Sequence, residues 1–184
     1  MDVKEAIESR RSYRSLTDTE ITEELIEDLA TAASLAPSCY NNQPWRYVFV
    51  YQEEQLKKLH KSLPEANNWA KNASLLIAIF TKPDLDCIVK DREYYLFDVG
   101  LAVNNLMLRA TELGLVTHLM AGFNAEQAKQ TLNIPDEMEL ISLMAVGERA
   151  DEIDPNLSPE MKKGEQQRPE RLDLEEIAYH NQVK

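Results

Sequence analysis

The densest group of chemically useful side chains is a basic run near the start of the chain, Arg10-Arg11-Ser12-Tyr13-Arg14. It holds three of the nine arginines of a chain that is otherwise acidic. Guanidinium groups around a hydroxyl form a set of donors suited to a phosphate or another polyanion. Basic residues at a helix C-terminus also complement the helix dipole, and for this segment alone that structural role is the better interpretation.

A second polar segment covers residues 36–46 and reads APSCYNNQPWR. Its hydroxyl and amide groups offer donors and acceptors together, which suits a neutral heterocycle with a mixed polar edge. Pro, Ser and Asn also favour turns for backbone reasons, so turn formation is the better interpretation of this segment when it is taken alone.

Two weaker signals lie in the second half of the chain. Residues 119–124 read LMAGFN after a predicted strand, and Gly122 lets a backbone approach a ligand closely. An ordinary strand-to-helix turn with Asn124 as N-cap explains the same residues equally well. Arg168 and Arg171 follow a polar stretch, where a solvated tail is the strong alternative.

Hydrophobic periodicity predicts the elements that must position these segments. Helices are expected at 2–10, from an N-cap at Thr22 to a stop before Pro37, and at 53–63, 92–115 and 125–132. Strands are expected at 45–51, 75–81, 117–123 and 139–146. Residues 151–171 are polar and hold three prolines, which favours an extended arm, and 172–179 favours a short helical or extended tail. Interleaved helices and strands indicate a mixed α/β or α+β fold.

The helix expected at 92–115 is apolar on nearly every face. A helix of this kind must be covered on most faces, so it is either the centre of the fold or it is covered by a second subunit. With 184 residues the chain is one domain, 1–184, in which 151–184 form the C-terminal arm.

Composition excludes several function classes. The chain has 20 Lys and Arg against 32 Asp and Glu, a formal net charge of −12, so no nucleic-acid or anionic membrane partner is expected. Residues 75–80 form the longest apolar run, far short of a membrane span. Cys39 and Cys87 form no CxxC and no disulfide framework, which suits a reducing cytoplasm, and no apolar signal segment opens the chain.

The five glycines are too dispersed for either standard phosphate-binding loop. The chain has no GxSxG, HExxH or EF-hand pattern, and its three histidines are scattered, so no metal site is expected. If the protein binds a phosphate, side chains must supply most of the charge. His118 lies in an apolar strand, where a lone histidine is more often a satisfied core residue than a catalyst.

The order of these motifs resembles that of the FMN-dependent nitroreductase family. The motifs are RRSYR, PSCYNNQPWR, a long helix ending in LGL, a GF turn and a late basic residue before Leu-Glu-Glu. The resemblance covers nearly the whole chain, and its first two motifs are quite specific. It implies an α+β fold with a mainly antiparallel central sheet flanked by helices. It also implies an intertwined homodimer in which the arm crosses to the partner and two FMN molecules lie in the interface.

The resemblance implies roles for the basic run. Arg10 and Ser12 match residues on the ribityl phosphate side of FMN, and Arg14 matches one at the N1/O2 edge of the flavin, where it tunes the cofactor. Arg11 has no matching role and is expected to be structural or to add to the positive field around the cofactor. Arg168 best matches a late phosphate-binding arginine.

Further residues follow from the same resemblance. Arg171 is the second choice for the late arginine. The segment holding Pro37, Ser38 and Asn41 matches one that reaches the flavin of the other subunit, with Gln43 close by. The backbone of residues 121–122 (Ala121 and Gly122) matches one that meets flavin N5. Some members carry an acidic residue where this chain has alanine, but a backbone contact survives that change. The chain also lacks a longer insert over the substrate pocket, so an open site is expected.

The resemblance therefore implies an FMN-dependent oxidoreductase that takes a hydride from NADH or NADPH and reduces nitroaromatics, quinones or similar acceptors in a ping-pong reaction. The flavin carries the chemistry and no catalytic side chain is required. Two alternatives stay open: another flavin reaction on the same fold, such as reductive dehalogenation or flavin fragmentation, and a non-catalytic dimeric flavin-binding protein.

Overall fold

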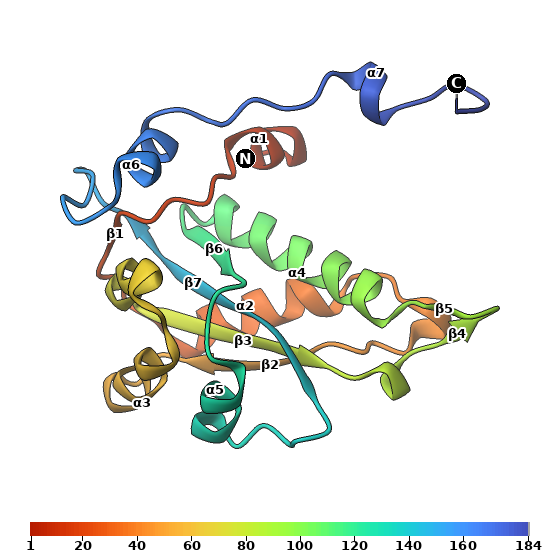
Figure 1. The fold of residues 1–184 in the computed structure, drawn as a ribbon, viewed down its shortest axis with the longest axis horizontal. Coiled ribbons are helices and arrows are strands. Elements are labelled where there is room, and N and C mark those ends of the chain that lie inside the picture. The colour runs from red at the N-terminus through yellow and green to blue at the C-terminus, as the bar shows by residue number, and fades with distance from the viewer. Residues whose placement is uncertain (184) are drawn as a thin grey trace.

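Strand β7 (Glu139–Arg149) is the element on which the sheet is built, because it pairs with three other strands. The computed structural model describes residues 1–183, and Figure 1 shows the sheet with helices packed against it. β7 pairs with β1 (Leu16–Thr17), β3 (Leu75–Thr81) and β6 (Val116–Met120), and β3 pairs with β2 (Arg46–Val50). Every one of these pairs is antiparallel, as expected.

Side-chain alternation along β3 and β7 sorts the core into two layers. Leu76 and Ala78 of β3 belong to one buried cluster, whereas Leu75, Ile77 and Ile79 belong to the other. Successive side chains of a strand point to opposite faces, so a nearly continuous apolar strand must be covered on both sides. The central strands therefore have helices on each face.

Helices α2 (Glu23–Ser34) and α4 (Tyr95–Glu112) cover one face of the sheet. Thr22 caps α2 as predicted, with its hydroxyl accepting from the Leu25 amide. The two helices are also joined by charge: the Arg109 guanidinium donates to both Asp28 carboxylate oxygens at 2.6–3.0 Å. On the other face the core includes residues of α3 (Glu53–Leu59), α5 (Ala125–Leu132) and a 3-10 segment (Glu65–Asn72).

The remaining elements lie at the two ends of the chain and at one edge of the fold. Helix α1 (Val3–Ser9) begins with a capping box between Asp2 and Glu5. Strands β4 (Ile88–Val89) and β5 (Arg92–Glu93) form a separate hairpin, so the helix expected from residue 92 begins three residues later. Two further helices follow β7, namely α6 (Pro159–Gln166) and α7 (Leu174–Ile177).

The expected arm contains a helix that the sequence reading missed. The proline content of this stretch favours an extended arm. However, Pro159 occupies the first turn of α6, where a backbone N–H would have no partner within the helix, so the lack of one does not destabilise it. Ser158 caps this helix by accepting from the Met161 amide. Beyond α6 the chain runs across the top of the molecule and away from it in Figure 1. Among residues 1–183 there is no helix both long and apolar enough to cross a membrane.

The expectation that the cysteines form no disulfide is wrong. Cys39 and Cys87 are bonded to each other, with their Cα atoms 6.1 Å apart. The register of the sheet is the reason: Arg46 pairs with Phe80, and the cysteines lie seven residues before and seven residues after that pair. Spacing along the chain could not reveal this, because the pairing of β2 with β3 brings the two segments together.

Leu29 on α2 is fully buried and provides a test of the core, whereas Leu35 at the end of the same helix is exposed. Leu29→Ala should lower the free energy of unfolding by about 2–5 kcal/mol, since it removes apolar contacts and leaves a cavity. Leu35→Ala should cost less than about 0.5 kcal/mol. Urea unfolding followed by circular dichroism measures both, and equal losses would contradict this packing.

Candidate functional site

The basic run begins where α1 ends, and the C-terminal arm returns to it. Arg10 is the C-cap of α1, and its guanidinium donates to the Ser12 hydroxyl at 3.3 Å. The Arg168 guanidinium donates to the backbone carbonyls of Glu8 and Arg10. These two carbonyls lie at the C-terminus of α1, where the helix dipole favours a cation. Residues 158 positions apart in the sequence are thereby brought into one group.

This group holds more positive charge than its surroundings neutralise. Burial lowers the pKa of Arg10, and the positive charges of Arg168 and Arg171 lower it further. Within residues 1–183, no carboxylate forms an ion pair with any of these three arginines. Three neighbouring guanidinium groups that form no ion pair favour an anionic ligand, and a phosphate matches their donor geometry.

Arg14 points to a different place, over the ring of Trp69, with its guanidinium carbon 5.8 Å from the ring centroid. Its Nε atom is buried and has no hydrogen-bond partner within the described chain. Burial lowers the pKa of Arg14, and the negative charge of Glu165 opposes that shift. A buried donor without a partner is costly, so the structure fits a ligand that brings an acceptor to Arg14.

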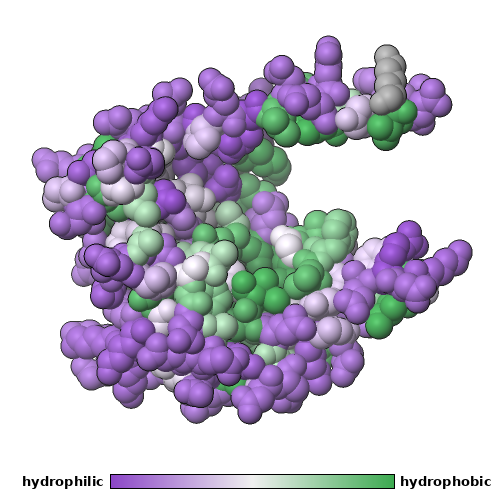
Figure 2. Space-filling model, viewed as in Figure 1, coloured by the Kyte–Doolittle hydropathy of each residue, from purple (hydrophilic) through white to green (hydrophobic). Residues whose placement is uncertain are grey.

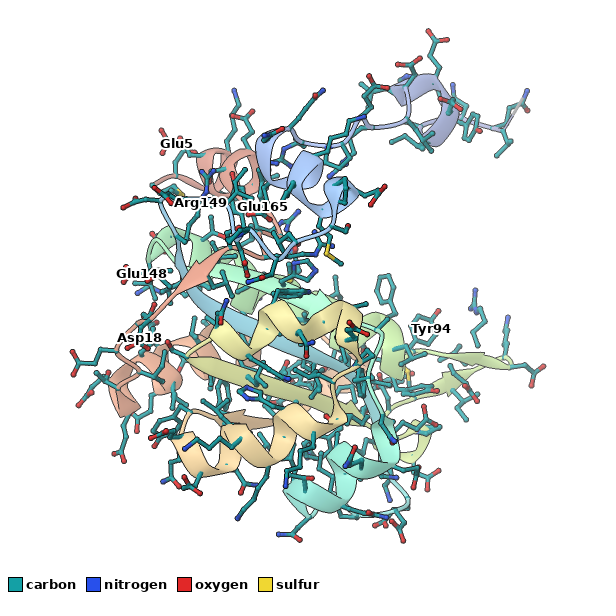
Figure 3. The ribbon with its side chains drawn as sticks, turned by 60° about the vertical axis from the view of Figure 1, so that its left-hand side comes forward. Glu5, Asp18, Tyr94, Glu148, Arg149 and Glu165 are labelled. Atoms are coloured by element: carbon teal, nitrogen blue, oxygen red, sulfur yellow. A yellow bond between two sulfur atoms is a disulfide. The ribbon has the colours of Figure 1, made fainter. Side chains whose placement is uncertain are left out.

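Glu165 of α6 holds the backbone of the basic run in place. This residue was not anticipated from the sequence. It is 2% exposed, and its carboxylate accepts from the Arg14 amide at 2.7 Å and from the Ser15 amide at 3.3 Å. Figure 3 labels it where α6 meets the N-terminal segment. The only sequence signal would have been a capped amphipathic helix inside the polar arm.

Arg11 contacts helix α6 of the C-terminal arm. Its guanidinium donates to the Gly164 carbonyl at 2.6 Å and lies 4.7 Å from the centroid of the Tyr13 ring. Arg149 packs against the same ring, 4.2 Å from its centroid. Arg11 therefore fastens the basic run to α6, which agrees with the structural role open to it from the sequence.

The turn after β6 joins the same group. His118 of β6 is buried, with Nδ1 3.1 Å from the Tyr13 carbonyl and its ring centroid 4.4 Å from that of Trp69. Residues 121–122 follow β6 and are exposed to solvent. The Asn67 amide donates to the Gly122 carbonyl at 2.6 Å. A Cβ at Gly122 would lie 3.4 Å from the Asn67 amide nitrogen, so glycine suits this close approach.

Asn67, which was not anticipated from the sequence, forms one contact surface with Trp69. Trp69 Nε1 donates to the Asn67 side chain at 3.3 Å, so the two form one wall between the Gly122 turn and Arg14. Trp69 is buried. Both lie in a 3-10 segment, which has no periodic signal of its own.

The second polar segment forms a separate part of the site. Its backbone has three non-glycine residues with positive φ, Tyr40 at 49°, Asn41 at 59° and Gln43 at 51°. Such conformations are costly and gather at ligand-binding segments when the surroundings hold them. Ser38 supplies part of that support, because its hydroxyl accepts from the backbone amide of Gln43 at 3.0 Å. The side-chain amide of Gln43 donates to the Asn41 carbonyl.

Asp98 anchors this segment to α4. It is 3% exposed and accepts from the Cys39 amide at 2.6 Å. Pro37 and Asn41 stay exposed, and Ser38 is half-buried. In Figure 1 this loop runs beside the β4–β5 hairpin, whereas the basic run and α6 lie at the top of the molecule. One chain therefore presents the predicted residues in two groups rather than in one place.

Comparison with known proteins identifies the family of the chain. Residues 7–148 match a family model described as the nitroreductase family. The chain belongs to this family. A protein of Archaeoglobus fulgidus with the provisional name NADH dehydrogenase/NAD(P)H nitroreductase is 32% identical over 152 residues, which cover 80% of this chain and 86% of that protein.

Two further similarities bear on this nitroreductase-family protein. A solved structure described as an oxidoreductase containing FMN superposes with a TM-score of 0.86 at 27% identity, covering all of this chain and 94% of that one. An iodotyrosine deiodinase of Nematostella vectensis is 26% identical and covers 83% of this chain and 69% of its own length.

His118 gives the site a predicted pH dependence. Burial, followed by the positive charge of Arg14, lowers the pKa of His118 to about 4 from an ordinary value of 6.5. The unfolded chain then binds a proton that the folded chain excludes, so stability is fully present above pH 6.5 and is lost as the pH falls toward 4. This residue should contribute a loss of about 2–3 kcal/mol between pH 7 and pH 4.5.

Urea unfolding at a series of pH values measures that loss. His118→Gln, which does not titrate, should flatten the dependence of stability on pH by the same amount. His180→Gln is the control, since His180 is exposed. Parallel curves for wild type and His118→Gln would show that the histidine is not held neutral in the fold.

Proposed function

We propose that this chain is an FMN-dependent oxidoreductase that takes reducing equivalents from NADH or NADPH and reduces nitroaromatics, quinones or similar electron-poor acceptors. The observation that carries the proposal is the group of Arg10, Arg168 and Arg171. Within residues 1–183, none of these three arginines forms an ion pair with a carboxylate. The chain has no glycine-rich phosphate loop, so a ligand phosphate must be held by side chains of this kind.

The phosphate end of the proposed cofactor fits this group. Arg10 and Ser12 already share a hydrogen bond, and Arg168 is held in place by two carbonyls of the α1 terminus. FMN has one phosphate, whereas the pyrophosphate and adenine of FAD would need more donors and more room. Arg171 donates to the Pro169 and Glu170 carbonyls and adds charge at the rim.

The flavin end fits Arg14 and the turn after β6. The Arg14 guanidinium over Trp69 supplies donors for the N1/O2 edge, and the exposed backbone of residues 121–122 can approach N5. When bound, FMN supplies hydride transfer from NAD(P)H to the acceptor, and the protein binds and orients the reactants. His118 is neutral at pH 7 and is buried against Trp69, so its role is to pack against the site rather than to donate a proton.

The proposed site is completed by a second copy of the chain. Pro37, Ser38 and Asn41 lie apart from the arginine group, so we propose that they contact the flavin of the partner. Phe97 and Leu96 of α4 are 64% and 48% exposed, and the arm beyond residue 171 carries exposed Leu172, Leu174 and Ile177. Figure 2 shows hydrophobic side chains gathered in the hollow between this arm and the body of the molecule.

The similarity to the deiodinase favours one second candidate, reductive removal of a halogen from an aromatic ring on the same cofactor. Both candidates require FMN, so the acceptor separates them. The purified protein should be yellow and release about one FMN per chain on acid denaturation, and it should oxidise NADH or NADPH with nitroaromatics or quinones. FAD, or no flavin uptake by apo-protein, would overturn the proposal. Turnover with a halotyrosine alone would favour the second candidate.

The shared site predicts that dimer and flavin are lost together. Phe97→Glu places a charge on an exposed apolar position of α4, where the interface should exclude water, and should yield monomers that hold FMN at least ~10-fold more weakly. Sedimentation at micromolar concentration and fluorescence titration of FMN measure the two properties. Gln130→Glu, an exposed position on α5, should change neither. A Phe97→Glu monomer with wild-type flavin affinity would contradict the shared site.

Arg14 predicts a shift in redox potential. A guanidinium stabilises negative charge at the N1/O2 edge more than it stabilises a neutral edge, and a charged hydrogen bond is worth about 1.5–3 kcal/mol. Arg14→Gln should therefore lower the flavin midpoint potential by roughly 30–60 mV, because 1.4 kcal/mol corresponds to about 30 mV for two electrons.

Dye-linked titration measures the potential of this variant. Arg11→Gln is the matched control, since Arg11 donates to the Gly164 carbonyl instead. It should lower stability and leave the potential unchanged. An unaltered potential in Arg14→Gln would show that this arginine lies elsewhere on the cofactor.

A further inference from the structure

The junction between the second polar segment and the β4–β5 hairpin holds a cluster of groups that the proposed flavin reaction does not use. The sulfurs of Cys39 and Cys87 and a carboxylate oxygen of Asp86 all lie within 4.8 Å of one another. All three residues are half-buried, and the cysteines are joined as a disulfide. Thiolates and carboxylates in one place are ligands that Zn²⁺ accepts.

Asp86 has one oxygen available to a ligand. Its Oδ1 accepts from the Cys87 amide at 2.8 Å and from the Asn42 side chain at 3.3 Å. Its Oδ2 is buried and has no partner among the described residues. An unpaired buried carboxylate oxygen costs free energy unless a proton or a cation satisfies it.

A second carboxylate lies beside the first. Asp98 is almost fully buried, and the Asp86 carboxyl is close enough to form a hydrogen bond with it when one of the two carries a proton. Neither carboxylate is paired with a lysine or arginine within residues 1–183. When both carboxyls are ionised they form a negative site, which a divalent cation would neutralise.

We propose that the reduced protein binds one Zn²⁺ per chain at this junction, with ligands from the Cys39 and Cys87 thiolates and the Asp86 carboxylate. Three protein ligands leave the fourth position of a tetrahedral zinc to a water molecule. The sequence showed no metal motif because the ligands come from a loop and a turn that are brought together only by the fold. The proposal holds whatever reaction the flavin site performs.

The zinc site and the disulfide are alternative states of the same cysteine pair. A dithiol reductant donates two electrons and two protons to the disulfide, breaking the sulfur–sulfur bond, and is itself oxidised to a disulfide. The two resulting thiols release their protons to solvent as they bind Zn²⁺. In the reverse direction a small-molecule disulfide accepts two electrons by thiol–disulfide exchange and leaves as two thiolates, the Cys39–Cys87 bond forms again, and the ion is released.

The backbone geometry is compatible with both states. In a tetrahedral site with Zn–S bonds of about 2.3 Å, the two sulfurs lie about 3.7 Å apart. The Cα atoms are 6.1 Å apart, so rotation about the two Cα–Cβ bonds opens the sulfurs without moving the strands. Asp98 holds the Cys39 amide at 2.6 Å, which keeps the loop in place when the disulfide is broken.

The test uses the full-length protein, reduced with a dithiol that is then removed without air, and Zn²⁺ as the probe. Equilibrium dialysis with elemental analysis should give one zinc per chain, and zinc X-ray absorption should show two sulfur and two oxygen neighbours. Zn²⁺ should raise the melting temperature of the reduced protein and leave that of the oxidised protein unchanged.

Asp86→Asn leaves both cysteines intact and should weaken zinc binding at least ~10-fold. Asp84→Asn is the matched control, since Asp84 is an exposed acid in the preceding turn, Pro83–Leu85, and its loss should have no effect. Cys87→Ser should abolish stoichiometric binding. The proposal is overturned if reduced wild type binds no zinc, if the bound ion has no sulfur neighbours, if the oxidised protein binds it equally, or if Asp86→Asn matches wild type.

Discussion

The antiparallel pairing of β7 with its three neighbours is the constraint on which the rest of the molecule depends. The basic run leads directly into β1 at one end of β7. β6, paired beside it, ends at the exposed turn of residues 121–122. β3 pairs in turn with β2, and this hairpin-like pair carries the second polar segment at its start and Asp86 after its end. A change in the register of β7 would move all of these segments at once.

Charge in this protein is distributed unevenly for a physical reason. The chain as a whole carries −12, yet Arg10, Arg168 and Arg171 form a group that raises its own free energy by mutual repulsion. Such a group persists because the fold holds it: Arg168 is tied to the end of α1, and Glu165 fixes the neighbouring backbone. A locally positive site in an acidic surface attracts an anion and discourages nucleic acid at the same time.

The two parts of the C-terminal arm differ in what they contact. Through α6 it packs against the basic run, where Arg11 and Glu165 join it to residues some 150 positions earlier. Beyond α6 it leaves the body of the chain with its apolar side chains exposed. An isolated monomer would leave these side chains in water, which supports our proposal that a second copy covers them.

Much of the fold could be predicted from residue patterns, because local preferences and periodicity act within one element. Thr22 begins α2, Asn124 begins α5, and β3 occupies residues 75–81 as its apolar run predicts. The motifs also identified the family, which the comparison with known proteins confirms. The site residues drawn from those motifs stay predictions, and the structure adds their division into two groups.

Residue types and their local spacing were enough to predict the elements, the family and the excess of arginine donors, since each depends on residues that are neighbours in the chain. Long-range packing was needed to show that Cys39 bonds to Cys87, that Glu165 supports Arg14, and that Asn67 contacts Gly122. These contacts join residues 48 to 151 positions apart. No local pattern encodes them, because strand register and helix packing set the distances between such residues.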